Sequence, residues 1–154
     1  MKRVVFLCSP ENPHSLMAEG LLRHIDSKNF EAVSVTASLG QIDALSIEVM
    51  KEIGVSLEPK ACTTIDGLRD QTFDFLITLD DATANHTHSI SAVDTVHWKF
   101  ESPIGTTGDE EAQRRAFRSL RDQIAQRLRL FAIVHTREIA LSGQAHFAAA
   151  TAAH

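Results

Sequence analysis

The chain has 154 residues, of which 44% are hydrophobic and 23% are charged, and its formal net charge is -5. This length fits a single domain with a substantial core, and the acidic balance gives no reason to expect nucleic acid or an anionic membrane surface as a partner. The apolar run at the N-terminus covers about five residues, too few for a signal peptide or a membrane span, and the two distant cysteines fit a reducing cytoplasm better than a disulfide framework.

The first predicted elements are a buried strand, a loop and a helix. Residues 4–7 are apolar and run into Cys8, prolines interrupt residues 9–14, and apolar residues then recur at helical spacing with Ser15 as the expected N-cap. A cysteine that faces a helix N-terminus is stabilised as a thiolate. We therefore expect the pKa of Cys8 to lie below the reference of about 8.5, with Glu11 opposing the shift. The alternative is that Cys8 is a small core residue.

The rest of the chain alternates strands and helices. Further strands are predicted at 31–37, 73–79 and 95–98, and helices at 43–53 and from 109 onward. One face of the last helix carries Phe117, Leu120, Ile124, Leu128 and Phe131. This alternation predicts an α/β fold with three layers, in which helices cover both faces of a four-stranded parallel sheet. Ligands bind such sheets beyond the carboxyl ends of the strands, where Cys8 and Asp80 would lie.

We divide the chain into an α/β domain at 1–134 and a C-terminal extension at 135–154. The extension is rich in alanine, and we expect it to prolong the last helix up to Gly143 and then fray. Packing of this extension on a second subunit, which would give a dimer, is the alternative. His86, His88 and His97 lack the compact spacing of metal ligands, so we expect no metal site. We expect a cytoplasmic protein.

Two stretches of the sequence resemble the low-molecular-weight protein tyrosine phosphatases and the arsenate reductases that share their fold. The family signature is a strand, a cysteine, a short loop, an arginine, a serine and a helix, and this chain has Cys8, Ser15 and the sequence Met-Ala-Glu-Gly-Leu at 17–21. Residues 97–103 read His-Trp-Lys-Phe-Glu-Ser-Pro where arsenate reductases carry His-Trp-x-Phe-x-Asp-Pro, so the arsenate reductases are the closer branch. The resemblance extends over residues 3–131.

The resemblance implies a thiol-based site that binds an oxyanion. Cys8 would be the nucleophile, and His14, at the position of the arginine, would replace the cation if it became an imidazolium. The other residues of the implied anion-binding loop are Ser9, Glu11, Asn12 and Ser15. The implied partner is a small oxyanion or a phosphorylated ligand, and the resemblance implies no cofactor.

This chain departs from the family pattern at most of the positions that carry the chemistry. His14 lacks the fork of an arginine, and Pro10 and Pro13 each remove one N–H group from the loop. Ser102 stands where the family has the aspartate that acts as a general acid, and Asp80 stands where arsenate reductases usually have a relay cysteine.

Three functions remain open from the sequence. The favoured hypothesis is a diverged member of this family with weak or no oxyanion chemistry at Cys8, which includes a pseudoenzyme that acts as a binding or regulatory module. The second is an active phosphatase or arsenate reductase in which His14 replaces the arginine. The third is a protein that uses the Cys8 thiol on a neutral or organic substrate.

Overall fold

A sheet of four parallel strands forms the centre of the computed structural model, which describes residues 1–36, 43–57, 65–85 and 90–152, with the backbone alone from 144 onward. The strand order is β2-β1-β3-β4, and every neighbouring pair is parallel. The strands are β1 (Lys2–Cys8), β2 (Phe30–Thr36), β3 (Thr72–Thr78) and β4 (Ser91–His97). The predicted α/β fold class with a four-stranded parallel sheet is confirmed.

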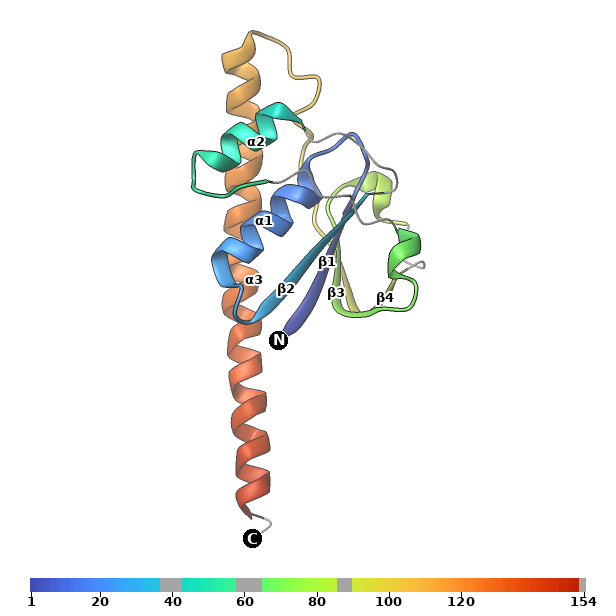
Figure 1. Cartoon of the computed structure of the whole chain (residues 1–154), viewed down its shortest axis with the longest axis vertical. Helices are drawn as coiled ribbons and strands as arrows, with labels where there is room; N and C mark the ends of the chain where they lie inside the picture. The colour runs from blue at the N-terminus through green and yellow to red at the C-terminus, as the bar shows by residue number, and fades with distance from the viewer. Residues whose placement is uncertain (37–42, 58–64, 86–89, 153–154) are drawn as a thin grey trace.

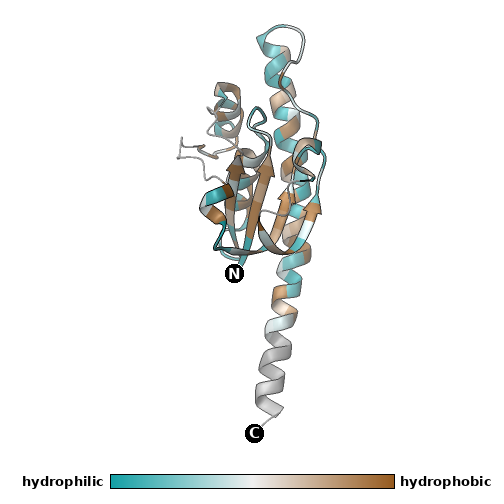
Figure 2. Cartoon of the chain, turned by 90° about the vertical axis from the view of Figure 1, so that its right-hand side faces the viewer, coloured by the Kyte–Doolittle hydropathy of each residue, from teal (hydrophilic) through white to brown (hydrophobic). Residues whose placement is uncertain are grey.

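The two faces of the sheet are covered differently. Alternate residues of β1 point to opposite faces, so Val4, Phe6 and Cys8 join the larger core cluster while Val5 and Leu7 join the smaller one. The larger cluster lies against the helices α1 (His14–Asp26), α2 (Ala44–Lys51) and α3 (Glu110–Ala152) (Figure 1). The smaller cluster includes Leu68 of the short helix η1 (Ile65–Leu68). Apolar residues are concentrated in the strands between these layers (Figure 2).

Helix α3 packs along the sheet and then continues past it (Figure 1). The predicted apolar face is buried, since Phe117, Leu120, Ile124, Leu128 and Phe131 are each at most 7% exposed. The helix runs through Gly143 to Ala152, whereas we expected fraying beyond Gly143. The packing of residues 135–154 on a second subunit stays a prediction. Within the ranges that the structure describes, none of the helices is long and apolar enough to cross a membrane.

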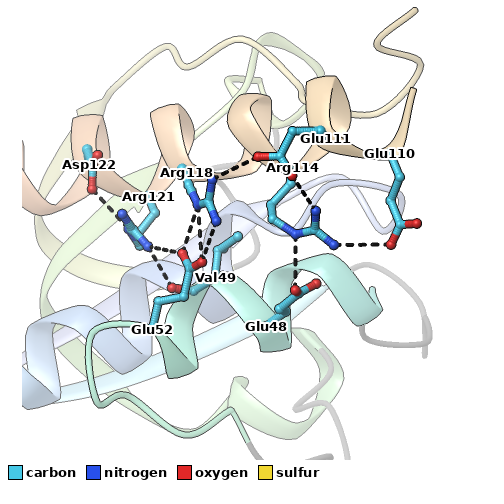
Figure 3. Close-up of polar contacts among 9 residues, drawn as sticks. All are labelled: Glu48, Val49, Glu52, Glu110, Glu111, Arg114, Arg118, Arg121 and Asp122. Atoms are coloured by element: carbon cyan, nitrogen blue, oxygen red, sulfur yellow. Dashed lines mark hydrogen bonds and ion pairs between the residues drawn. The ribbon is translucent and has the colours of Figure 1, made fainter. Parts of the chain in front are cut away.

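Arginines of α3 bind carboxylates at α2 in what we call the α2–α3 ion-pair network (Figure 3). Arg118 donates to both carboxylate oxygens of Glu52, and Arg114 donates to Glu48. Arg121 donates to Glu52 at 2.9 Å and to the backbone carbonyl of Val49 at 2.7 Å. These bonds fix the carboxyl end of α2 against α3.

The carboxyl ends of β1, β3 and β4 bring three loops together. The loop after β1 covers residues 9–13, and the loop after β3 contains Asp80 and the short helix η2 (Asp81–Thr83). The loop after β4 runs from Trp98 toward α3 and contains Ser102. The predicted candidate site therefore lies at this edge of the sheet.

Candidate active site

The sulfur of Cys8 lies at the end of β1 and is fully buried. Its Sγ is 3.3 Å from the carbonyl oxygen of Asn12 and 3.1 Å from Oγ of Ser15, and the backbone N–H of Ser15 donates to it at 3.3 Å. Since a carbonyl oxygen only accepts hydrogen bonds, the contact with Asn12 requires the S–H proton. The surroundings of Cys8 therefore favour the neutral thiol.

The acidity of Cys8 is the opposite of what the sequence led us to expect. Burial raises the pKa of Cys8 to about 11, and the carboxylates of Asp80 and Glu11 add to this effect. The hydrogen bonds from Ser15 lower the pKa without compensating for burial. The prediction of a lowered pKa was wrong, because the loop buries the sulfur and places a carbonyl beside it, although the first turn of α1 does supply one N–H.

The backbone N–H groups of the loop after β1 are largely engaged within the protein. Ser9 N donates to Oδ2 of Asp80 at 2.8 Å, and Asn12 N donates to the carbonyl of Ser9 at 3.0 Å. The latter bond closes a turn with Pro10 at its second position, where the fixed φ of proline is favourable. Pro10 and Pro13 have no N–H to offer. In this conformation the loop is a hydrogen-bonded turn and has few donors left for an anion.

The sequence placed Asp80 at this edge of the sheet but did not predict its role as the central hydrogen-bond acceptor of the site. Asp80 is 7% exposed, and its carboxylate accepts from Ser9 N, from Nδ2 of Asn12 at 2.9 Å, and from both N and Oγ1 of Thr83. Burial raises the pKa of Asp80, but the hydrogen bonds from Thr83, Ser9 and Asn12 outweigh it and leave the pKa below its ordinary value. Its position before η2, with Thr83 three residues on, was the available signal for a capping role.

His14 does not present a positive charge to the site. Helix α1 begins at His14, and Ser15 does not cap it, because the Ser15 hydroxyl contacts Cys8 instead. The His14 ring is fully buried and its Nε2 is 3.2 Å from the carbonyl oxygen of Phe100, so Nε2 carries the proton. Burial lowers the pKa of His14 despite the opposing effect of the Phe100 carbonyl. Burial therefore favours the neutral ring over the imidazolium that His14 would need in order to replace the arginine.

The closed arrangement around His14 has an energetic cost. With the proton on Nε2, Nδ1 is a buried acceptor that finds no donor among the residues the structure describes. A buried acceptor without a donor costs about 1–3 kcal/mol.

Ser102 comes close to the loop after β1, as its position in the resemblance required. Its hydroxyl donates to Oδ1 of Asn12 at 2.6 Å and accepts from Ile104 N at 3.2 Å. Of the predicted site residues, Cys8, Ser9, Asn12, Ser15 and Ser102 meet with Asp80, while the Glu11 side chain is exposed. Cys62, His86 and His88 lie outside the described residues.

His97 belongs to a separate hydrogen-bonded chain at the same edge. Its Nδ1 is 2.7 Å from Oγ1 of Thr78, and its Nε2 is 3.2 Å from Oδ1 of Asp81, which also pairs with Lys99. Across the described ranges, histidine, cysteine and acidic side chains form no group of three that could hold a metal ion.

Comparison with known proteins points to one family. The family described as low molecular weight phosphotyrosine protein phosphatase matches residues 3–142. The arsenate reductase of Halalkalibacterium halodurans is 30% identical over 132 residues, which cover 85% of this chain and 95% of that protein. The arsenate reductase of Bacillus subtilis is 28% identical over 132 residues, with the same coverage.

Solved structures share the fold. An arsenate reductase in the reduced state has a TM-score of 0.71 at 22% identity, and the similarity covers 85% of this chain and 96% of that chain. The Vibrio vulnificus protein Wzb in complex with benzylphosphonate has a TM-score of 0.68 at 17% identity, with 85% and 97% covered.

Proposed function

The chain belongs to the low molecular weight phosphotyrosine protein phosphatase family, and within it we propose that this protein is a diverged member with weak or no oxyanion chemistry at Cys8. The observation that carries the proposal is the contact between the Cys8 sulfur and the Asn12 carbonyl in a buried setting. A nucleophilic cysteine acts as the thiolate, and this contact favours the thiol. Burial raises the pKa of Cys8 to about 11, so the thiol is the dominant form at pH 7.

The backbone of the loop supports the same conclusion. An oxyanion site needs N–H groups that point to the position where charge develops. Here the N–H of Ser9 is bonded to Asp80 and that of Asn12 to Ser9, and two prolines have none. Loss of one such donor costs about 2.7–4 kcal/mol of transition-state stabilisation, so the loss of several leaves little catalysis.

The side chains that would assist the reaction are also unsuited to it. His14 is buried and neutral, so it supplies neither the permanent charge nor the two-pronged hydrogen bonding of an arginine. The hydroxyl of Ser102 does not release a proton near neutral pH. An active phosphatase or arsenate reductase would require His14 as a cation, and the geometry around His14 does not support that alternative. These features fit a binding or regulatory module on this fold, and chemistry of the Cys8 thiol on a neutral or organic substrate stays the other alternative.

Turnover assays test the proposal. Three chains are assayed for hydrolysis of para-nitrophenyl phosphate and for arsenate reduction. The first is the wild type, and the second is the double variant His14→Arg/Ser102→Asp. The third is a graft, in which residues 9–14 are replaced by the loop of an active relative and Ser102 is replaced by Asp. We expect near-background rates from the first two, because neither has the missing N–H groups. The graft should hydrolyse para-nitrophenyl phosphate robustly but should not reduce arsenate, since Asp80 still stands at the position of the relay cysteine. Cys8→Ser in each chain measures the background.

Two results would count against the proposal. Substantial turnover by the wild type that disappears in Cys8→Ser would mean that His14 suffices as the cation. A crystal soaked in arsenate or phosphate that holds the anion over Cys8 in the wild type would mean that the loop retains an anion site. The first result would replace the proposal with the active-enzyme alternative, and the second would contradict the argument that the loop has few donors left for an anion.

A further inference from the structure

We infer that Cys8 is a gated thiol, that is, a thiol that a reagent reaches only when the segments around it move apart. These segments are the loop after β1 and residues 100–102, which we call the strap. The side chain of Asn12 is the latch that holds the two segments together. The inference rests on the proposed function, because it concerns a thiol that catalysis does not use. It adds that the thiol becomes reactive when the latch opens while the core stays folded.

Asn12 joins all three loops at the carboxyl edge of the sheet. Its Nδ2 donates to Asp80 in the loop after β3 at 2.9 Å, and its Oδ1 accepts from Ser102 in the loop after β4 at 2.6 Å. Its backbone carbonyl is the oxygen that contacts the Cys8 sulfur at 3.3 Å. The two side-chain bonds therefore hold in place the carbonyl that covers the sulfur.

His14 binds the same strap at a second point. Its Nε2 donates to the carbonyl of Phe100 at 3.2 Å, two residues before Ser102. The strap is thus attached to the Cys8 loop at two points, one buried at His14 and one exposed at Ser102. Loss of the bond to Ser102 together with the bond to Asp80 would free the Asn12 carbonyl to leave the sulfur without moving a strand.

The latch is weaker than the core beneath it. Cys8 and Ser15 are fully buried, whereas Asn12 is partly exposed and Ser102 is exposed, so water competes for the latch bonds. Exposed hydrogen bonds with few apolar contacts are those that open locally at low free energy. The Nδ1 of His14, which has no donor within the part of the chain that the structure describes, further lowers the stability of the closed arrangement. Local opening is therefore the route by which a reagent reaches the sulfur.

The test is alkylation of Cys8 by iodoacetamide at pH 8, followed by mass spectrometry, with Cys62→Ala in every chain. We expect slow labelling of the otherwise wild-type chain. Asn12→Ala should label about tenfold faster or more, and Ser102→Ala by a smaller factor, because it removes one of the two side-chain bonds. The double variant should label no faster than Asn12→Ala, since the two residues share that bond. Asn29→Ala is the matched control, because it removes another partly exposed asparagine, one that donates to Asp26 at the opposite end of the sheet from Cys8, and it should label at the wild-type rate.

Circular dichroism and labelling in low concentrations of urea separate local opening from unfolding. The gate is supported if the labelling rate of Asn12→Ala does not change with urea concentration well below its unfolding transition. Equal labelling rates for the wild type, Asn12→Ala and Ser102→Ala, all folded, would overturn the gate. If Asn12→Ala does not fold, Ser102→Ala alone decides, because its side chain is exposed. The readout is thiol reactivity, so failure here leaves the turnover assays of the proposed function unaffected.

Discussion

The Cys8 site and the α2–α3 ion-pair network both connect distant segments through polar side chains, yet they stand in opposite surroundings. At the Cys8 site the sulfur, His14 and Ser15 are fully buried, and Asp80 is 7% exposed. In the network the side chains of Glu52 and Arg118 are 33% and 35% exposed. The network contains more ion pairs than the Cys8 site, but its side chains are more exposed. The number of ion pairs alone therefore does not indicate which region contributes more to stability.

The two regions differ in whether water can replace a hydrogen-bond or ion-pair partner that is lost. An exposed ion pair that is broken regains hydration, and salt already screens it, so its contribution is small. A buried donor or acceptor that loses its partner keeps the full cost of desolvation. We therefore expect substitutions at the Cys8 site to cost far more than substitutions in the network.

The largest effect is expected for Asp80→Ala. It removes the acceptor for Ser9 N, Asn12 Nδ2 and Thr83 together, and leaves buried donors without partners. We expect a loss of about 3 kcal/mol or more in the free energy of unfolding, measured by urea denaturation. Asp81→Ala is the control at the adjacent position, where the carboxylate is 66% exposed and pairs with His97 and Lys99. Equal losses for the two variants would contradict the comparison.

The pH dependence of Asp80 adds a second measurement. Its pKa is lowered in the folded protein, so its stabilising contribution is complete above the ordinary pKa of about 3.9 and is lost as the pH falls through the folded value. The stability difference between the wild type and Asp80→Asn should therefore narrow below pH 4. A difference that stays constant into strong acid would mean that the ionised carboxylate is not what the donors bind.

The next effect concerns the acidity of Cys8. Because burial raises its pKa to about 11, the rate of iodoacetamide alkylation in a Cys62→Ala chain should keep rising above pH 9, well beyond the range of a free thiol. A rate that levels off below the free-thiol value of about 8.5 would instead restore the expectation from the sequence.

A smaller loss is expected for His14→Arg, which restores the family's arginine. The side chain at position 14 is fully buried and bonded to the Phe100 carbonyl, so a longer charged group must enter a closed space. We expect a loss of about 2 kcal/mol in the free energy of unfolding, since overpacking and an unpaired charge are both unfavourable. His24→Arg on the exposed side of the same helix is the control and should leave stability nearly unchanged. Greater stability in His14→Arg would mean that the loop still fits an arginine.

The regions also differ in how far the sequence predicted them. Local periodicity was sufficient for β1, for Cys8 at its end and for the buried face of α3, because neighbours in the sequence determine these patterns. The neutral state of His14 and the role of Asp80 depend on partners 86 and 71 residues away, Phe100 and Ser9. Spacing in the sequence could place these residues at one edge of the sheet, but it could not determine which groups bond there.

The smallest effect is expected in the network, where Glu52→Gln should destabilise the protein less than Asp80→Ala or His14→Arg. The bonds from Arg118 and Arg121 lower the pKa of Glu52 to about 2, so its carboxylate stays ionised over most of the acid range. A lowered pKa gives stability that is present above the ordinary value of about 4.3 and is lost as the pH falls toward 2. Thermal midpoints of the wild type and Glu52→Gln should therefore differ slightly at pH 7, converge near pH 2, and approach each other in about 0.5 M salt, because salt screens exposed charges.

Arg121→Ala sharpens this measurement, since Arg121 is only 11% exposed and also donates to the carbonyl of Val49. It should be more destabilising than Arg118→Ala and less dependent on salt, and a reversed order would mean that the exposed pairs, rather than burial, determine the stability of the α2–α3 contact.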